Sequence, residues 1–268
     1  MSQKEKKEPH DLITEEGVKT ALKNQCGNDA DLLTWKIHDF TQRGDNYASV
    51  VSSVLVAYTK NSKRQWTSFI VKISPCGGMM AMNDGIANMF RKESHFYSKI
   101  IPALNKELIA AGQPGLKVPK CYHFNLNKDE EIIFLEDLRD EGFKMTDKKK
   151  GLDAAHLNLV LQELGRMHAA SILLKGTKSR EQLLAEYPCL KEEFLNEEQS
   201  KTEMMRGFAK GVTEGGSHLI EDIDGYKEVA KIISGFDFWE IILKQMESTP
   251  PFEVICHGDC WVNNVLFK

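Results

Sequence analysis

The final stretch of the chain, residues 254–268, most constrains how the chain can fold. A β-rich apolar run at 252–256 is broken at Gly258, polar residues follow, and an apolar run resumes at Val265. This pattern predicts two short strands that flank a loop, with Asp259 and Asn264 facing the same space. The fold must therefore hold a polar loop between two ordered segments.

The spacing of Asp259 and Asn264 suggests a chemical role for this loop. In kinases, an aspartate at this distance before an asparagine accepts the proton of the attacking hydroxyl, and the asparagine helps to hold Mg²⁺ on the nucleotide phosphates. The alternative is a hairpin in which both side chains only stabilise turns. Because so short a motif occurs by chance, other parts of a nucleotide site are needed to decide.

The composition is that of an ordinary globular protein and excludes several functions. A formal net charge of −4 over 268 residues argues against a nucleic-acid partner. The charged N-terminus is not a secretory signal, and no apolar run is long enough for a membrane span, so we expect a cytoplasmic protein without a membrane partner. No cysteine pattern predicts a zinc site or a disulfide framework; the cysteines are Cys26, Cys76, Cys121, Cys189, Cys256 and Cys260.

A lysine and a glutamate supply further parts of a possible nucleotide site. Residues 65–74 alternate as a strand that carries Lys72 near its end, where kinases place the lysine that binds the α- and β-phosphates. Residues 86–101 form a helical pattern, and Glu93 falls within its apolar stripe, which includes Met89. A carboxylate there requires a cation, and Lys72 is the natural partner. The alternatives are a solvated glutamate and a lysine with an exposed ammonium group.

Two connecting segments complete the N-terminal half. The turn around Gly44, Tyr47 and Ser49 separates two strand patterns and could cover ATP phosphates with its backbone N–H groups, although a plain hairpin turn is the alternative. A later apolar strand ends in the acidic connector that contains Glu136 and Leu138, whose charged residues could equally cap a surface strand. In all, we expect strands at 35–40, 50–58, 65–74, 118–124 and 131–135.

The C-terminal half reads as mostly helical. Residues 152–173 form an amphipathic pattern with Leu157 and His168 on its apolar side. We interpret His168 as a core histidine that braces the loop at 257–264 by hydrogen bonding; the alternative is a core histidine without such a role. Helical patterns continue to about residue 244, with expected breaks at Pro188, Gly215-Gly216 and Gly235.

The sequence of these segments resembles that of the ecdysteroid kinase-like (CHK kinase-like) family, within the aminoglycoside phosphotransferase and choline kinase group. The stretch His257-Gly-Asp-Cys-Trp-Val-Asn-Asn-Val-Leu-Phe267 carries most of the resemblance, together with Leu135-Glu-Asp-Leu138. The resemblance implies an α+β, bilobal protein-kinase-like fold with an antiparallel-sheet N-lobe and a mostly helical C-lobe. The expected divisions are a tail and short helix at 1–30, the N-lobe at 31–137, and a partial C-lobe at 138–268.

The resemblance also implies a reaction and a set of roles. ATP and Mg²⁺ would be bound, and a hydroxyl of a small molecule, such as a steroid alcohol, would be phosphorylated. Gly44, Tyr47 and Ser49 would cover the phosphates, while Glu136 and Leu138 would lie at the hinge that reads the adenine. Lys72 would hold the α- and β-phosphates, and Glu93 would orient Lys72. Asp259 would be the catalytic base and Asn264 a metal ligand.

The sequence departs from the family after Asn264. A kinase needs a second metal-binding aspartate shortly beyond the catalytic loop, and this sequence reaches Lys268 without one. We therefore expect a C-terminally truncated kinase whose transfer activity is impaired. The alternatives are a non-catalytic, pseudokinase-like nucleotide-binding module and a metal-dependent phosphoesterase, which lacks the further Asp/His clusters of a two-metal site.

Overall fold

The structure is a computed structural model, and it describes residues 8–39, 49–75, 83–193, 196–246 and 253–268. The chain divides into two compact units. One unit comprises Met1–Cys189 together with Val254–Lys268, and the other comprises Leu190–Glu253. All the residues that the sequence assigns to a nucleotide or metal site belong to the first unit.

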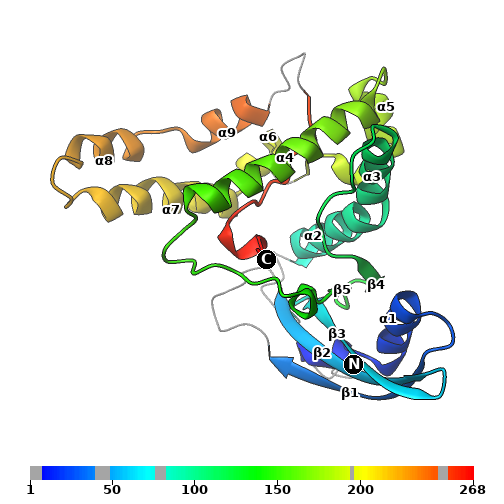
Figure 1. The fold of residues 1–268 in the computed structure, drawn as a ribbon. Helices are drawn as coiled ribbons and strands as arrows, with labels where there is room; N and C mark the ends of the chain where they lie inside the picture. Colours follow the sequence, from blue (N-terminus) through cyan, green and yellow to red (C-terminus); the bar gives the residue numbers. More distant parts are fainter. Residues whose placement is uncertain (1–7, 40–48, 76–82, 194–195, 247–252) are drawn as a thin grey trace, which may run out of the picture. The chain divides into compact units, whose positions relative to one another are not determined.

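An antiparallel five-stranded sheet forms the centre of the first unit (Figure 1). The strands lie in the order β1-β2-β3-β5-β4, so β1 is an edge strand and β3 is central. The five strands predicted between residues 35 and 135 are all present, with ends shifted by a few residues. Together with the many helices, this sheet confirms the expected α+β class. The strand bounds are β1 Asp31–Asp39, β2 Val50–Lys60, β3 Lys63–Ile73, β4 Cys121–Asn125 and β5 Ile132–Glu136.

A tight turn fixes the register between β2 and β3. The two turn residues, Asn61 and Ser62, have φ values of 52° and 58°, as a type I′ hairpin turn requires. From this turn the ladder continues to its far end and pairs Lys72 with Val51. Side chains of paired residues share a face of the sheet. The turn therefore decides which β2 side chains lie beside Lys72.

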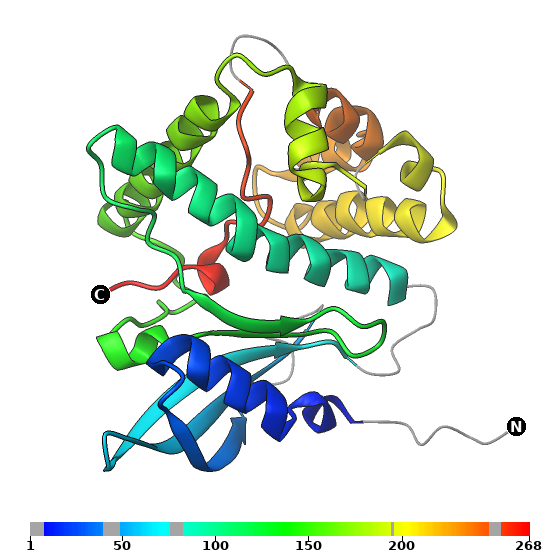
Figure 2. The same ribbon diagram turned by 90° about the vertical axis from the view of Figure 1, so that its right-hand side faces the viewer.

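The two faces of the sheet carry two different hydrophobic clusters. On one face, the helix α1 (Glu15–Cys26) packs against Phe69, Val71 and Phe134. On the other, Phe90 from the helix α2 (Asn83–His95) packs with β5 side chains. Figure 2 shows α1 and α2 on opposite sides of the sheet. The sheet is thus a buried middle layer, and Lys72 lies on its α2 face.

Three consecutive helical segments form one continuous run beside the sheet. After α2 come the π-helical turn η3 (Phe96–Ile100) and the helix α3 (Ile101–Ala110). The π turn has a physical cause at Pro102, which has no N–H to donate and whose ring clashes with the carbonyl one turn earlier. Along this run Phe90 and Ile100 are buried as expected, but Met89 is 50 % exposed and lies outside the apolar stripe.

The remainder of the first unit is helical and irregular. The longest helix, α4, is capped by the Asp153 carboxylate, which accepts a hydrogen bond from the His156 N–H. Met167 of α4 is buried, whereas Leu157 is 46 % exposed and does not join the expected apolar side. The bounds are η1 Pro9–Leu12, η4 Leu138–Glu141, α4 Ala154–Lys175, α5 Arg180–Glu186, η5 Pro188–Leu190 and η6 Val262–Asn264.

The second unit is a small group of helices. The helices α7 (Glu203–Ile220) and α8 (Lys227–Ser234) pack against each other, and α9 (Phe238–Met246) contacts α7. The short helix α6 spans Glu197–Ser200. Contrary to expectation, Gly215-Gly216 does not break α7. α7 packs against α8, and tertiary packing overrides the low helix propensity of glycine.

In the described part of the chain, we find no helix that is both long enough and apolar enough to cross a membrane.

The aromatic core between α1 and the sheet should dominate the stability of the first unit. Phe134 is 1 % exposed, and its ring meets the Phe69 ring edge-on at 6.2 Å between centroids. We expect Phe134→Ala to lower the free energy of unfolding by about 3–5 kcal/mol. The half-exposed Leu33 is the control, because Leu33→Ala removes little buried area. Denaturant unfolding followed by tryptophan fluorescence measures both, and equal losses would contradict the assigned core.

Candidate functional site

Lys72 and Glu93 form an ion pair that joins the sheet to α2. The Lys72 Nζ lies 2.6 Å from Glu93 Oε1. β3 directs Lys72 to the α2 face, and Glu93 lies one turn from the buried Phe90. The two side chains are 29 % and 31 % exposed, so the pair adds little net stability. A pair this open still leaves the ammonium accessible to a phosphate.

The surroundings of Glu93 contain weak acids that remain neutral. Burial, and then the charge of Glu93, raise the pKa of the Tyr97 hydroxyl. Burial also raises the pKa of the Cys121 thiol to about 11, with a further contribution from Glu93. Since neither group ionises near neutral pH, neither adds a second negative charge beside Glu93, whose carboxylate pairs with Lys72 at 2.6 Å.

The C-terminal loop brings Asp259 and Asn264 together. The Asn264 Nδ2 donates to the Asp259 carboxylate at 2.8 Å and to its backbone carbonyl at 2.9 Å. The Asp259 N–H donates to His257 Nδ1 at 3.2 Å. Gly258 between them has a φ of 82°, a conformation that glycine adopts at little cost. Both views of the fold place this red loop on the α2 side of the sheet (Figures 1 and 2).

The flanks of this loop do not form the expected pair of strands. Residues 253–257 belong to no strand, and Phe267 instead forms an isolated bridge with Lys144. The Phe267 ring also meets the His156 ring edge-on, at 4.5 Å between centroids. The apolar runs at both ends of the loop contact other parts of the first unit, and these contacts form in place of a hairpin.

Ser171 of α4 anchors the other end of the loop. Its hydroxyl accepts a hydrogen bond from the Ile255 N–H at 3.0 Å and donates to the His168 carbonyl at 2.7 Å. Sequence reasoning assigned the bracing role to His168, which here contributes its backbone carbonyl. The small polar Ser171 gave no signal in the sequence, because its partner lies 84 residues away.

The Ser171 hydrogen bond should determine how tightly the loop is held. Because Ser171 is only 2 % exposed, we expect Ser171→Ala to cost about 1–2 kcal/mol of stability and to speed hydrogen exchange at the Ile255 amide. Ser234→Ala is the matched control, since that hydroxyl donates to a carbonyl of its own helix, Lys231. Unchanged exchange at Ile255 would contradict the anchor.

In the connector after β5, the side chain of Glu136 is held by neighbouring residues of the sheet. The Glu136 carboxylate accepts hydrogen bonds from the Lys120 N–H at 3.1 Å and the Tyr122 hydroxyl at 3.3 Å. Glu136 pairs with Phe69, so its side chain lies on the face opposite to Lys72. The Glu136 N–H donates to the Lys120 carbonyl at 2.8 Å, so Glu136 can offer a nucleotide only its backbone carbonyl. Leu138 opens the 3₁₀ helix η4 that follows.

Asp137 is a buried acidic residue to which the sequence assigned no role of its own. Its side chain is 1 % exposed and accepts hydrogen bonds from Arg139 Nε at 2.8 Å and the Ser68 hydroxyl at 2.7 Å. Burial opposes ionisation, but the bonds from Arg139 and Ser68 outweigh it and lower the pKa of Asp137. The carboxylate is thus ionised at neutral pH and paired with Arg139.

Part of the expected phosphate loop lies outside the described residues. Gly44 and Tyr47 are among these, while Ser49 immediately precedes β2 and is partly buried. β2 continues from there to Val51, which pairs with Lys72. A segment at Ser49 therefore leads directly to the strand beside Lys72.

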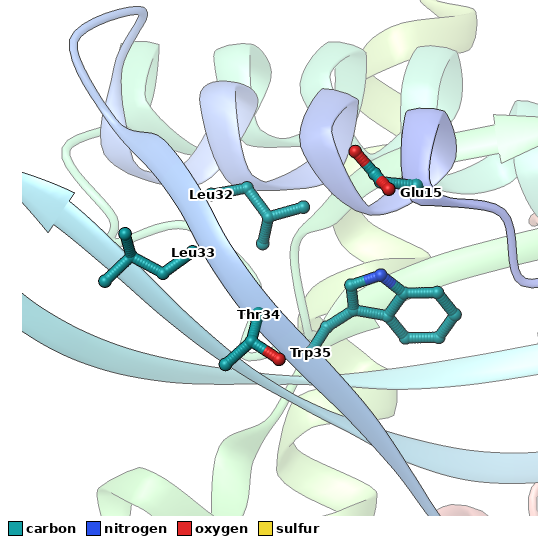
Figure 3. A pocket seen from close by; sticks show the side chains of 5 residues that line it. All are labelled: Glu15, Leu32, Leu33, Thr34 and Trp35. Carbon is teal, nitrogen blue, oxygen red and sulfur yellow. The ribbon is translucent and has the colours of Figure 1, made fainter.

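A pocket of about 210 Å³ lies elsewhere, between α1 and β1. It is lined by Glu15 and by the β1 residues 32–35 (Figure 3). The carboxylate of Glu15 would repel a phosphate, and none of the predicted site residues that the structure describes lines this pocket. The pocket does not suit a nucleotide.

The oxygen atoms of the loop fit Mg²⁺ better than a transition metal. Among the residues described, no group of three or more His, Cys, Asp or Glu side chains is placed to hold a metal ion. Asp259 and Asn264 instead offer a carboxylate and an amide oxygen. Mg²⁺ commonly binds one or two such groups together with substrate phosphates. The pair could thus hold Mg²⁺ when a nucleotide supplies further oxygens.

The sheet, the Lys72–Glu93 pair and the helices define the class: an α+β, kinase-like fold. A model of the ecdysteroid kinase-like family matches residues 43–268. The chain belongs to the ecdysteroid kinase-like family. Membership implies, in general, a kinase-like phosphotransferase that acts on small molecules. Searches of curated proteins and of solved structures returned no match.

Proposed function

We propose that this chain binds ATP with Mg²⁺ and transfers the γ-phosphoryl group to a hydroxyl of a small molecule, with a steroid alcohol such as an ecdysteroid as the acceptor. The observation that carries the proposal is the Lys72–Glu93 ion pair at 2.6 Å. A kinase site needs this pair in place before it can bind the nucleotide phosphates productively. Family membership supports the acceptor class, and the dependence on ATP suggests a cytoplasmic location.

The residues divide the work of phosphoryl transfer. Lys72 binds the α- and β-phosphates and Glu93 orients it, while backbone groups at Glu136 and Leu138 bind the adenine. Asp259 takes the proton of the acceptor hydroxyl as the oxygen bonds to the γ-phosphorus and the bond to the leaving oxygen of ADP breaks. Asn264 would hold Mg²⁺ together with the nucleotide phosphates. When bound, Mg²⁺ neutralises phosphate charge. Positioning and charge neutralisation supply most of the catalysis.

Phosphoryl transfer from Mg·ATP to a panel of alcohols tests the proposal. The panel should contain ecdysteroids, other sterols, choline and an aminoglycoside, with product detected by mass spectrometry and nucleotide binding measured in parallel. We expect a phosphorylated steroid whose formation stops when EDTA removes the metal. Nucleotide binding without transfer to any alcohol would favour the pseudokinase-like reading. Absence of both binding and transfer would reject the proposal.

A further inference from the structure

The most elaborate polar cluster of the first unit lies at the connector after β5. The carboxylate of Asp137 accepts a hydrogen bond from the Arg139 backbone N–H at 3.1 Å. This bond adds to the side-chain hydrogen bonds described above. Arg139 Nη2 also donates to the Ser53 hydroxyl at 2.8 Å. Through hydrogen bonds, the buried Asp137 carboxylate thus joins the segment after β5 to two strands. It reaches β3 through Ser68, and β2 through Arg139 and Ser53. We call Asp137, Arg139, Ser53 and Ser68 the connector clamp.

The clamp lies on the face of the sheet that carries Lys72. Ser68 and Lys72 alternate along β3 with the core residues Phe69 and Val71, so both point to the α2 face. Ser53 pairs with Ile70 on that same face. Ser53 and Ser68 are only 6 % and 7 % exposed. The clamp and the phosphate-binding lysine therefore share one surface of the sheet and one strand.

The clamp begins where β5 ends. The last pair between β3 and β5 joins Phe69 to Glu136, so the ladder no longer fixes the backbone from Asp137 onward. From this residue onward, the hydrogen bonds of the clamp hold residues 137–139 to β3 and β2. Burying a carboxylate costs several kcal/mol unless it is fully paired. A connector that needed only to be stable could use apolar residues, whereas the clamp fixes the position of the backbone.

We propose that Asp137, through the connector clamp, is a positioning residue for the nucleotide base. The clamp holds the backbone at residues 136–138 at a fixed place relative to Lys72, so that base and phosphates are bound in register. Asp137 itself does not contact the nucleotide. This inference rests on the proposed function, and it adds a determinant of base affinity and base selectivity that lies outside the binding groups themselves.

The test compares ligands that share phosphates but differ in the base. ATP, GTP and inorganic tripolyphosphate are titrated by calorimetry into the full chain and into Asp137→Asn. We expect the Kd for ATP to rise about tenfold, as for loss of a charge-assisted hydrogen bond. The Kd for tripolyphosphate should stay unchanged and the preference for ATP over GTP should shrink. Asp147→Asn is the matched control, because Asp147 caps a turn in the same connector through the Lys149 N–H without reaching the sheet.

A second variant, Ser53→Ala, keeps the proposal testable if Asp137→Asn fails to fold. Ser53→Ala removes one bond to Arg139 but leaves Asp137 paired, and it should shift ATP affinity in the same direction by a smaller factor. Equal losses for ATP and tripolyphosphate in the variants would mean a merely structural role and would overturn the proposal, as would an unchanged preference for ATP over GTP. If the wild-type chain binds none of the three ligands, the proposed function fails first, and Asp137 with it.

Discussion

Replacing Asp259 with asparagine is expected to abolish phosphoryl transfer while nucleotide binding persists. The amide retains an oxygen for the Asn264 N–H, which now donates to the carboxylate at 2.8 Å, so the loop keeps its shape. The lost function is proton acceptance from the acceptor hydroxyl, and general-base catalysis of this kind contributes about 10²–10⁴-fold. The measurement is kcat with saturating ATP and acceptor, beside an ATP titration.

Asp224→Asn provides the matched control for this change. Asp224 is exposed in the turn between α7 and α8, so the same chemical change there should leave kcat unaltered. Retained turnover in Asp259→Asn would remove Asp259 from the base role. Loss of ATP binding along with turnover would instead place Asp259 among the groups that hold the metal and nucleotide.

Replacing Lys72 with methionine is expected to reduce kcat/KM for ATP by about 10- to 100-fold. This range corresponds to the loss of hydrogen bonds to a charged group, about 1.5–3 kcal/mol. Methionine keeps most of the apolar stem, and the pair with Glu93 is nearly a third exposed, so folding should be little affected. Steady-state kinetics at varied ATP, with thermal unfolding to confirm folding, measures the effect.

Two further variants sharpen the result for Lys72. Lys63→Met lies at the exposed opposite end of β3 and serves as the control with the same chemical change. Glu93→Gln should reduce kcat/KM in the same direction but less, because Lys72 remains and loses only its orienting partner. If Lys72→Met has the kcat/KM of the wild-type chain, the ion pair is structural and the nucleotide phosphates bind elsewhere.

Local periodicity was sufficient to predict the Lys72–Glu93 pair. Alternation in β3 separated Lys72 from the buried Phe69 and Val71, and the helical repeat placed Glu93 beside Phe90. A carboxylate near an apolar stripe requires a cation as its partner, and few cations were candidates for pairing with Glu93. The spacing of Asp259 and Asn264 likewise predicted that they share a space, as their hydrogen bond confirms. Their catalytic roles stay predictions.

The same patterns were wrong where burial depends on neighbours. Met89 and Leu157 match their helical repeats yet are half exposed, because a periodic pattern states which face is apolar and not how far a neighbour covers it. The runs beside the Asp259 loop read as a hairpin, but the Phe267 backbone pairs with Lys144. A strand pattern does not specify its partner.

The sequence by itself determined the five strands of the sheet and the pairing of Lys72 with Glu93, because each follows from short-range spacing along the chain. Only the tertiary structure revealed what holds those residues in place. Ser171 meets Ile255 across 84 residues, and Asp137 meets Ser68 across 69. Such contacts leave no periodic trace in the sequence, since a single hydrogen bond between small polar groups is specified by the packing that surrounds it.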